Sequence, residues 1–208
     1  MIKKVNNKKF IIKTGDITTE ETDVIVCWTT PTLASGDETF VKIHKEAGSV
    51  LYEECLHSLM KYGKQKSFDV QHEIAVGSNI ITNAGMLPAY NIVHSVLPNY
   101  RIKSQYNNRL PILIAGVKLS LELVKAYGDS RVPLHAVTFP PVSEKIYGTV
   151  DKKTIEDFFK VLLDTEGLKK FTIICETEEL TEQYSKIFAR LTSTMVERWL
   201  NRIFKTEY

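Results

Sequence analysis

Two loops, separated by about a hundred residues, contain the side chains best suited to binding a ligand. The first loop holds Thr30, Gly36 and Asp37, and the second runs from Pro140 to Gly148. Each loop follows a short apolar run and precedes a helical pattern. In an open α/β sheet, ligands bind beyond the carboxyl ends of the strands, where helix N-termini present unpaired N–H groups. We therefore expect the two loops to close on one anionic ligand.

Three carboxylates near these loops can be interpreted in two ways. Asp16 follows the first apolar run, where an ionised carboxylate can accept a hydrogen bond from the exocyclic amine of a base, but aspartate is also common in plain turns. Asp37 and Glu38 can complement the positive end of a helix dipole. Because the same two charges would repel a diphosphate, we favour the structural role for this pair.

The elements that must position the loops are short runs rich in β-branched and aromatic residues, which alternate with helical patterns. Pro111 fits a helix only within the first turn, Gly48 marks a bend in another helix, and Asp151 is the expected cap of a third. The alternation predicts an α/β fold, a three-layer α/β/α sandwich around a central mixed sheet. Strands are predicted at residues 9–13, 24–28, 90–97, 135–139 and 171–175, and helices at residues 38–55, 106–127 and 152–163.

The end of the chain predicts one long helix. From Glu179 onward there is no Pro or Gly, and apolar residues recur at helical spacing. We therefore divide the chain into a domain at residues 1–178 and a helical extension at residues 179–208. The extension either packs on the domain, which is the simpler interpretation, or forms a homodimer surface built on Trp199, Leu200 and Phe204.

Composition excludes several classes of protein. The 208 residues are 43% hydrophobic and 25% charged with a net charge of +2, as in ordinary soluble proteins, and no apolar stretch approaches the ~20 residues of a membrane span. The three cysteines form no CxxC pair or zinc-binding pattern, so we expect no metal, no cofactor and a reducing, cytoplasmic location. His44, His94 and Cys27 are interpreted as buried core residues.

Several short motifs together resemble one family. Gly15-Asp-Ile-Thr18, Ile43-His-x-x-Ala-Gly48, Ile92-Val-His-Ser-Val96 and Ser143-x-x-Ile-Tyr-Gly148 follow one another as in macro domains, the ADP-ribose-binding modules. Gly36-Asp37 and Val96-x-Pro-Asn-Tyr100 most resemble the viral members of that family. The likeness covers about residues 9 to 178.

The resemblance implies a particular arrangement of ligand contacts. Asp16 would select adenine and Ile17 would pack beside the base. The loops carrying Gly36 and Ser143 would surround the phosphates and ribose. Ile146 and Tyr147 would line the distal ribose, although a tyrosine before glycine is equally suited to packing.

The sequence departs from this family at positions that matter for chemistry. Hydrolytic macro domains usually have Asn at the position of Thr30 and often Asp at that of Phe40, and Phe40 cannot accept a proton. Lys145 replaces a glycine that lets backbone N–H groups approach the phosphates. It can pair with a phosphate, or fill the groove and pair with Asp37 or Glu38. Glu176 stands where many relatives place an aromatic that stacks on adenine.

These observations leave three hypotheses. The first is binding of ADP-ribose or a related nucleotide without the usual hydrolysis. The second is hydrolysis of ADP-ribosyl groups or ADP-ribose-1''-phosphate by replacement residues, with Asp37 or Lys145 orienting water or substrate. The third is a decayed site on a fold that binds protein or single-stranded nucleic acid. Its basic and aromatic residues are Lys61, Tyr62, Lys64 and Lys66, and Tyr100, Arg101, Lys103, Tyr106 and Arg109.

Overall fold

The computed structural model describes the backbone of residues 1–65, 72–130 and 132–205, and the side chains of these residues as far as Ser193. The strands are β1 (Ile2–Val5), β2 (Lys8–Thr14), β3 (Thr22–Thr29), β4 (Lys64–Gln65), β5 (His72–Glu73), β6 (Asn79–Asn83), β7 (Ala89–Val96), β8 (Ala136–Phe139) and β9 (Lys170–Cys175). The helices are η1 (Ile17–Thr19), α1 (Glu38–Ala47), α2 (Ser49–Tyr62), α3 (Lys103–Tyr106), α4 (Arg109–Ser130), α5 (Glu144–Tyr147), α6 (Lys152–Asp164) and α7 (Glu178–Lys205).

The large sheet is mixed, as predicted. Its order is β1-β2-β9-β8-β3-β7-β6. The central strands β2, β9, β8, β3 and β7 are parallel to one another. At the two edges, β1 is antiparallel to β2 and β6 is antiparallel to β7. The short strands β4 and β5 form a separate antiparallel pair.

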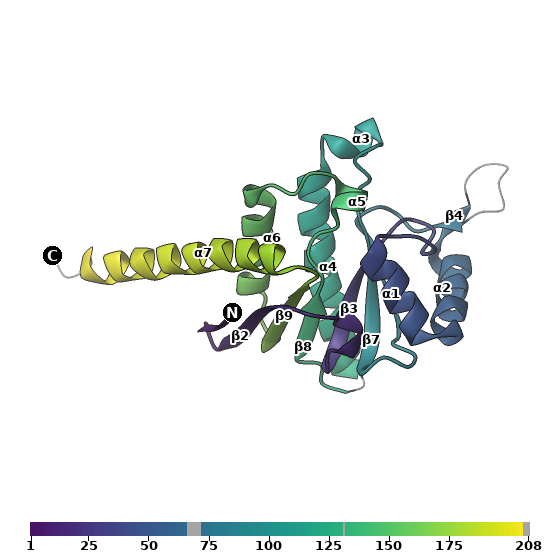
Figure 1. Ribbon diagram of the computed structural model, residues 1–208, viewed down its shortest axis with the longest axis horizontal. Helices are drawn as coiled ribbons and strands as arrows, with labels where there is room; N and C mark the ends of the chain where they lie inside the picture. Colours follow the sequence, from purple (N-terminus) through teal and green to yellow (C-terminus); the bar gives the residue numbers. More distant parts are fainter. Residues whose placement is uncertain (66–71, 131, 206–208) are drawn as a thin grey trace.

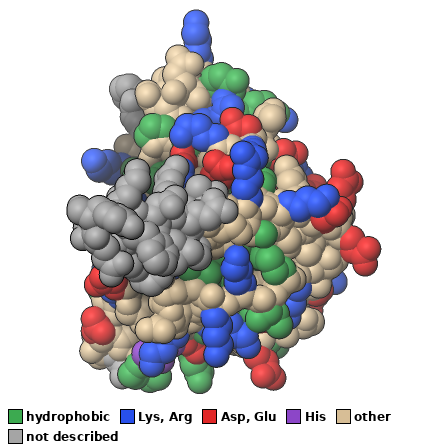
Figure 2. Space-filling model, turned by 90° about the vertical axis from the view of Figure 1, so that its left-hand side faces the viewer, with side chains coloured by type: hydrophobic (Ala, Val, Ile, Leu, Met, Phe, Trp, Pro, Cys, Tyr) green, Lys and Arg blue, Asp and Glu red, His purple; other side chains and the backbone are tan. Residues whose placement is uncertain are grey.

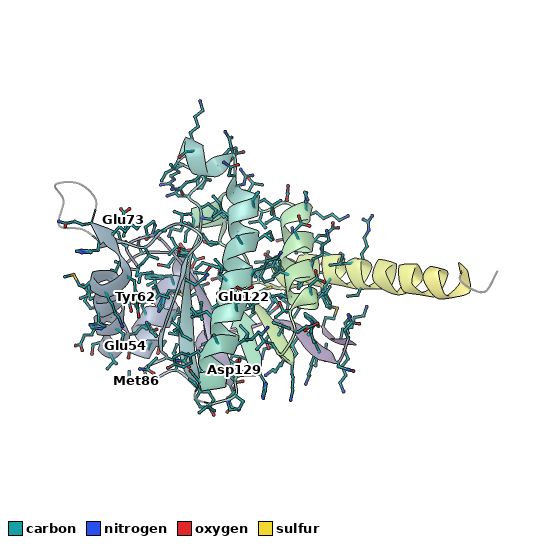
Figure 3. All side chains as sticks on the ribbon, turned by 180° about the vertical axis from the view of Figure 1, so that it is seen from behind. Glu54, Tyr62, Glu73, Met86, Glu122 and Asp129 are labelled. Carbon is teal, nitrogen blue, oxygen red and sulfur yellow. The ribbon has the colours of Figure 1, made fainter. Side chains whose placement is uncertain are left out.

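Helices cover both faces of this sheet, which gives the predicted three layers (Figure 1). Side chains alternate along β3, so Val24 and Trp28 join a core with α4, α6 and α7, while Ile25 and Cys27 join a core with α1 and α2. Seen from behind, α4 crosses one face with Glu122 and Asp129, whereas α2 lies to the side (Figure 3). Each face of the sheet therefore has its own hydrophobic core.

Local capping and turn features agree with the sequence predictions. Gly48, at φ +83°, separates α1 from α2 and makes the expected bend. Pro111 lies in the first turn of α4. The Asp151 carboxylate accepts a hydrogen bond from the Thr154 backbone N–H at 2.8 Å and so caps α6.

Helix α7 begins as part of the domain and then extends beyond it (Figure 1). Tyr184 and Phe188 are buried in the core where α7 packs against α6 and β2. The Tyr184 hydroxyl accepts a hydrogen bond from the Val142 backbone N–H at 3.0 Å. The first half of α7 therefore packs on the domain, while the side chains of Trp199, Leu200 and Phe204 lie outside the described residues.

The described helices include none with both the length and the apolar character that a membrane crossing requires.

Replacing Tyr184 by Phe tests the role of α7 in the domain. The change leaves the buried Val142 N–H without its partner, so we expect the free energy of unfolding to fall by about 1–3 kcal/mol. Chemical denaturation followed by circular dichroism measures this loss. The matched control is Tyr90→Phe, at a residue that is 63% exposed. Equal stability of the two variants would show that the hydroxyl is not an anchor.

Candidate functional site

The order of the parallel strands brings the predicted loops to one edge of the sheet. Asp16 follows the end of β2, Glu176 follows β9, the second loop follows β8, and the first loop follows β3. These four strands are consecutive neighbours and run in the same direction. Their carboxyl ends therefore present Asp16, Glu176 and the two loops side by side.

The first loop is closed by its own hydrogen bonds. The Thr30 hydroxyl lies 2.7 Å from the Ser35 hydroxyl, and the Thr30 backbone N–H donates to the Ser35 carbonyl at 3.1 Å. Leu33, at φ +52°, is buried and donates its backbone N–H to the Thr30 carbonyl at 3.0 Å. The hydroxyl of Thr30 is therefore engaged within the loop.

Helix α1 starts tightly after this loop. The Asp37 carboxylate accepts a hydrogen bond from the Phe40 backbone N–H at 2.9 Å and so caps the helix, which is a structural role beyond the dipole effect expected from the sequence. A Cβ atom on Gly36 would lie 2.4 Å from the Phe40 Cβ atom. Only glycine leaves room for the chain to enter the helix along this path.

The second loop is held by two side chains from distant elements, one from β3 and one from α7. The Trp28 indole N–H donates to the Pro141 carbonyl at 2.7 Å, and Tyr184 of α7 accepts from the Val142 N–H. Ser143 then begins α5, and its buried hydroxyl has no hydrogen-bond partner among the described residues. Trp28 and Tyr184 were not predicted as site residues, because their partners lie far away in the sequence.

Two residues of α5 that were predicted to contact the ligand are buried in the hydrophobic core. Tyr147 is fully buried and Ile146 is 4% exposed, and both belong to the core beneath the loop. Gly148 ends α5 at φ +85°, and a Cβ atom there would lie 2.8 Å from the Tyr100 Cβ atom. The burial of Tyr147 agrees with the packing role that the sequence allowed, and its contact with the distal ribose stays a prediction.

A pocket of about 220 Å³ lies between the two loops. Asp37, Ser143 and Lys145 line it, whereas Asp16, Ile17, Thr30, Gly36, Ile146 and Tyr147 do not. Residues that sequence reasoning did not assign to the site complete its walls, and they include Thr39, Val150, Ile155, Leu180 and Gln183.

Lys145 crosses this pocket and pairs with the first loop. Its ammonium lies 2.8 Å from Glu38 Oε1, which is the pairing expected in the second of its two predicted roles. This hydrogen bond lowers the pKa of Glu38 and raises the pKa of Lys145. Both side chains are exposed, so the pair is held only weakly.

The lining of the pocket is acidic. It contains the four carboxylates of Asp37, Glu38, Glu144 and Glu176 and a single ammonium, that of Lys145. Each of the other acids has a local partner. Glu144 accepts from the Val150 N–H at 3.2 Å, and Glu176 accepts from the Thr39 hydroxyl. The carboxylates thus outnumber the cation, which disfavours a bound phosphate.

Asp16 follows β2 at the same edge of the sheet, outside the pocket lining, and is an ionised acceptor. One carboxylate oxygen accepts from the Thr18 N–H and hydroxyl, and the other lies 2.9 Å from the Lys42 ammonium. Partial burial raises the pKa of Asp16, but the hydrogen bonds from Thr18 and Lys42 together lower it below its usual value. Ile17 is buried against the α1 side of the sheet.

Comparison with known proteins gives the family. The Macro domain family model matches residues 30–156, and the chain belongs to this family. An O-acetyl-ADP-ribose deacetylase from Cronobacter turicensis is 31% identical over 180 residues, covering 85% of this chain and 93% of the relative. One from Klebsiella pneumoniae is 30% identical over 183 residues, covering 84% and 93%. These relatives are bacterial, and the expected likeness to viral members stays a prediction.

Solved structures support the fold. The Oceanobacillus iheyensis macrodomain with ADP has a TM-score of 0.78 at 23% identity, covering 93% of this chain and 97% of that one. The Trypanosoma brucei macrodomain in complex with ADP has a TM-score of 0.66 at 18% identity, covering 88% and 69%. At these identities the likeness establishes the α/β/α architecture.

Replacing Gly36 by Ala tests the tight entry into α1. Because the added methyl would meet the Phe40 Cβ atom, the helix start must shift, and we expect a loss of about 1–3 kcal/mol in unfolding free energy. Gly15→Ala is the control, since the nearest atom to its Cβ would be Ile174 Cγ2 at 3.8 Å. Thermal or urea unfolding compares the two variants, and a neutral Gly36→Ala would contradict the tight path.

Proposed function

We propose that this macro domain binds ADP-ribose or a related nucleotide at the carboxyl edge of its parallel strands, without the hydrolysis usual among its relatives. The observation that carries the proposal is the pocket between the α1 start and the second loop, at the sheet edge that also carries an ionised Asp16. Support comes from the macrodomains of Oceanobacillus iheyensis and Trypanosoma brucei, whose structures were solved with ADP. This edge is also where open α/β folds bind nucleotides.

Three side chains have chemistry suited to this ligand. Asp16 is an ionised acceptor that can take a hydrogen bond from the base amine, beside Ile17. The Ser143 hydroxyl is buried without a partner among the described residues and lines the pocket, so it can donate to a ligand oxygen. Lys145 can contact a phosphate once it leaves Glu38.

The pocket must widen to admit a whole nucleotide. Its volume of about 220 Å³ is below the range of about 300–1,000 Å³ that is typical for ligand sites. The Lys145–Glu38 pair spans the gap between the loops, and exposed pairs of this kind separate readily. We infer that binding separates this pair and moves the two loops apart.

Hydrolysis is the second candidate, because the bacterial relatives are named deacetylases. It would need Asp37 or Lys145 to orient water or substrate. Asp37 caps α1, Lys145 pairs with Glu38, and Thr30 bonds within its own loop, so none of the three is free for that task. Acetate release from O-acetyl-ADP-ribose that disappears in Asp37→Ala would favour hydrolysis over simple binding.

Nucleic-acid binding has less support. Arg109 lies over the Tyr106 ring at 4.0 Å and Arg101 lies over the Tyr100 ring at 5.5 Å, so one face of each ring is already covered. Lys and Arg are interspersed with Asp and Glu on the face from which α7 projects (Figure 2). Lys66 lies outside the described residues. A gel shift with single-stranded oligonucleotides, repeated at several ionic strengths, tests this hypothesis.

We also propose a cellular location and a homodimer for this protein. Three unpaired, buried cysteines fit the reducing, cytoplasmic location that we propose. The extension of α7 beyond the domain is compatible with a homodimer through its last turns, which analytical ultracentrifugation would detect.

Calorimetric titration with ADP-ribose tests the main proposal. We expect saturable binding that Asp16→Ala weakens about tenfold, because a hydrogen bond to a charged acceptor is lost. The control is Asp23→Ala, since Asp23 caps His135 and Ala136 at the opposite edge of the sheet. Absence of heat at millimolar ligand would remove the proposal, and equal weakening by both variants would place the base elsewhere.

Replacing Glu38 by Gln tests the electrostatics of the pocket. The variant removes one negative charge and releases Lys145, so we expect ADP-ribose to bind roughly threefold more tightly at low ionic strength and the gain to shrink with salt. Glu46→Gln is the control, because Glu46 pairs with Lys45 outside the pocket at 3.4 Å. Weaker binding by Glu38→Gln would mean that the pair holds the loops in their binding geometry.

A further inference from the structure

Three side chains that commonly bind metals meet on the α1 side of the sheet, beneath the first loop. They are Cys27 of β3, His94 of β7 and His44 of α1. One ligand atom from each lies within 4.8 Å of the other two. None of the three lines the pocket between the two loops.

The sheet register explains why two of them meet. Cys27 and His94 are direct partners in the parallel pairing of β3 with β7, so both side chains point to the same face. Helix α1 covers this face and places the His44 ring 5.6 Å from the His94 ring, measured between centroids. The Phe40 ring stacks on the His44 ring at 4.0 Å between centroids and restricts its position.

Two imidazole nitrogens in the cluster have no hydrogen-bond partner among the described residues. They are His44 Nε2 and His94 Nδ1, and both atoms are buried. His94 is fully buried, and the Nε2 atom of His44 is buried although that residue as a whole is only half-buried, so solvent does not supply the missing contacts. Buried polar atoms in folded proteins nearly always have partners, so two adjacent exceptions require an explanation.

The other nitrogen of His94 is oriented in the way typical of a metal ligand. His94 Nε2 lies 3.0 Å from the Thr82 hydroxyl. When Nε2 carries the hydrogen and donates to Thr82, Nδ1 keeps a free lone pair that can bind a metal. Metal-binding histidines are usually held by such a bond from the second nitrogen. Cys55 lies 3.7 Å from Nε2, the nitrogen that contacts Thr82, and so is not counted among the ligands.

We propose that Cys27 Sγ, His44 Nε2 and His94 Nδ1 bind one Zn²⁺ ion. A thiolate and two imidazoles are ligands that Zn²⁺ takes readily. Zinc bonds of about 2.0–2.3 Å imply ligand separations of roughly 3.3–3.8 Å, so closure from 4.8 Å requires side-chain shifts of about 1 Å. The sequence predicted no metal because residues 27, 44 and 94 follow no zinc-binding spacing.

The ion would connect the elements that carry the first loop. Cys27 lies near the end of β3, which leads into Thr30, and His44 lies on the helix that Asp37 begins. A bound ion would therefore join α1 to the two strands on which it packs. We expect zinc to raise the unfolding temperature of the whole chain.

Metal analysis of the full chain tests the proposal. Chelator-treated protein is incubated with Zn²⁺, separated from free metal by gel filtration and analysed by mass spectrometry for metal. We expect one equivalent of zinc in the wild type, and none in Cys27→Ala or His94→Gln. The matched control is Cys175→Ala, which removes a fully buried cysteine of β9 in the other core and should keep the ion.

A second measurement covers the case in which a ligand variant fails to fold. Co²⁺ added to the wild type and to Cys175→Ala should give the near-ultraviolet charge-transfer absorption of a cobalt–thiolate bond. It should also slow alkylation of Cys27 relative to the metal-free protein. Folded wild type that retains no zinc and gives no cobalt spectrum overturns the proposal. Retention of copper alone overturns the assignment to zinc.

Discussion

The register of β3 against its parallel neighbours is the constraint on which the rest of the structure depends. Alternation along this strand turns Trp28 toward α4, α6 and α7 and turns Cys27 toward α1. Trp28 then reaches the carbonyl of Pro141 and holds the second loop, while the chain after Thr29 forms the first loop. A slip of one residue would exchange the two faces and separate the loops from their supports.

The first loop is stabilised by hydrogen bonds within itself, and the second is stabilised by a contact with α7. Thr30 bonds to Ser35 in the first loop, and Val142 bonds to Tyr184 at the base of the second. The contact between the loops, from Lys145 to Glu38, joins two exposed side chains and is correspondingly weak. The distance between the loops can therefore change without unfolding either one, which separates ligand entry from domain stability.

The acidic character of the pocket follows from the structural tasks of its carboxylates. Asp37 caps α1, Glu144 accepts from the Val150 N–H, and Glu176 accepts from the Thr39 hydroxyl. These bonds hold the walls in position but leave the pocket more negative than a phosphate site would be. The family fold is thus combined with a lining that weakens attraction for a diphosphate, and selectivity would depend mostly on the base and ribose ends of a ligand.

The sequence by itself determined those features that depend on near neighbours along the chain. Strand and helix periodicity predicted the α/β sandwich. The Asp151 cap, the Gly48 bend and a structural role for Asp37 at a helix start were predicted because each involves residues within one helical turn. Tertiary structure alone decided that Lys145 pairs with Glu38, that Tyr147 is buried, and that Tyr184 supports the second loop. It also brought Cys27, His44 and His94 together. The order and register of the sheet determine these contacts, because they set which distant segments come within a few ångströms of one another.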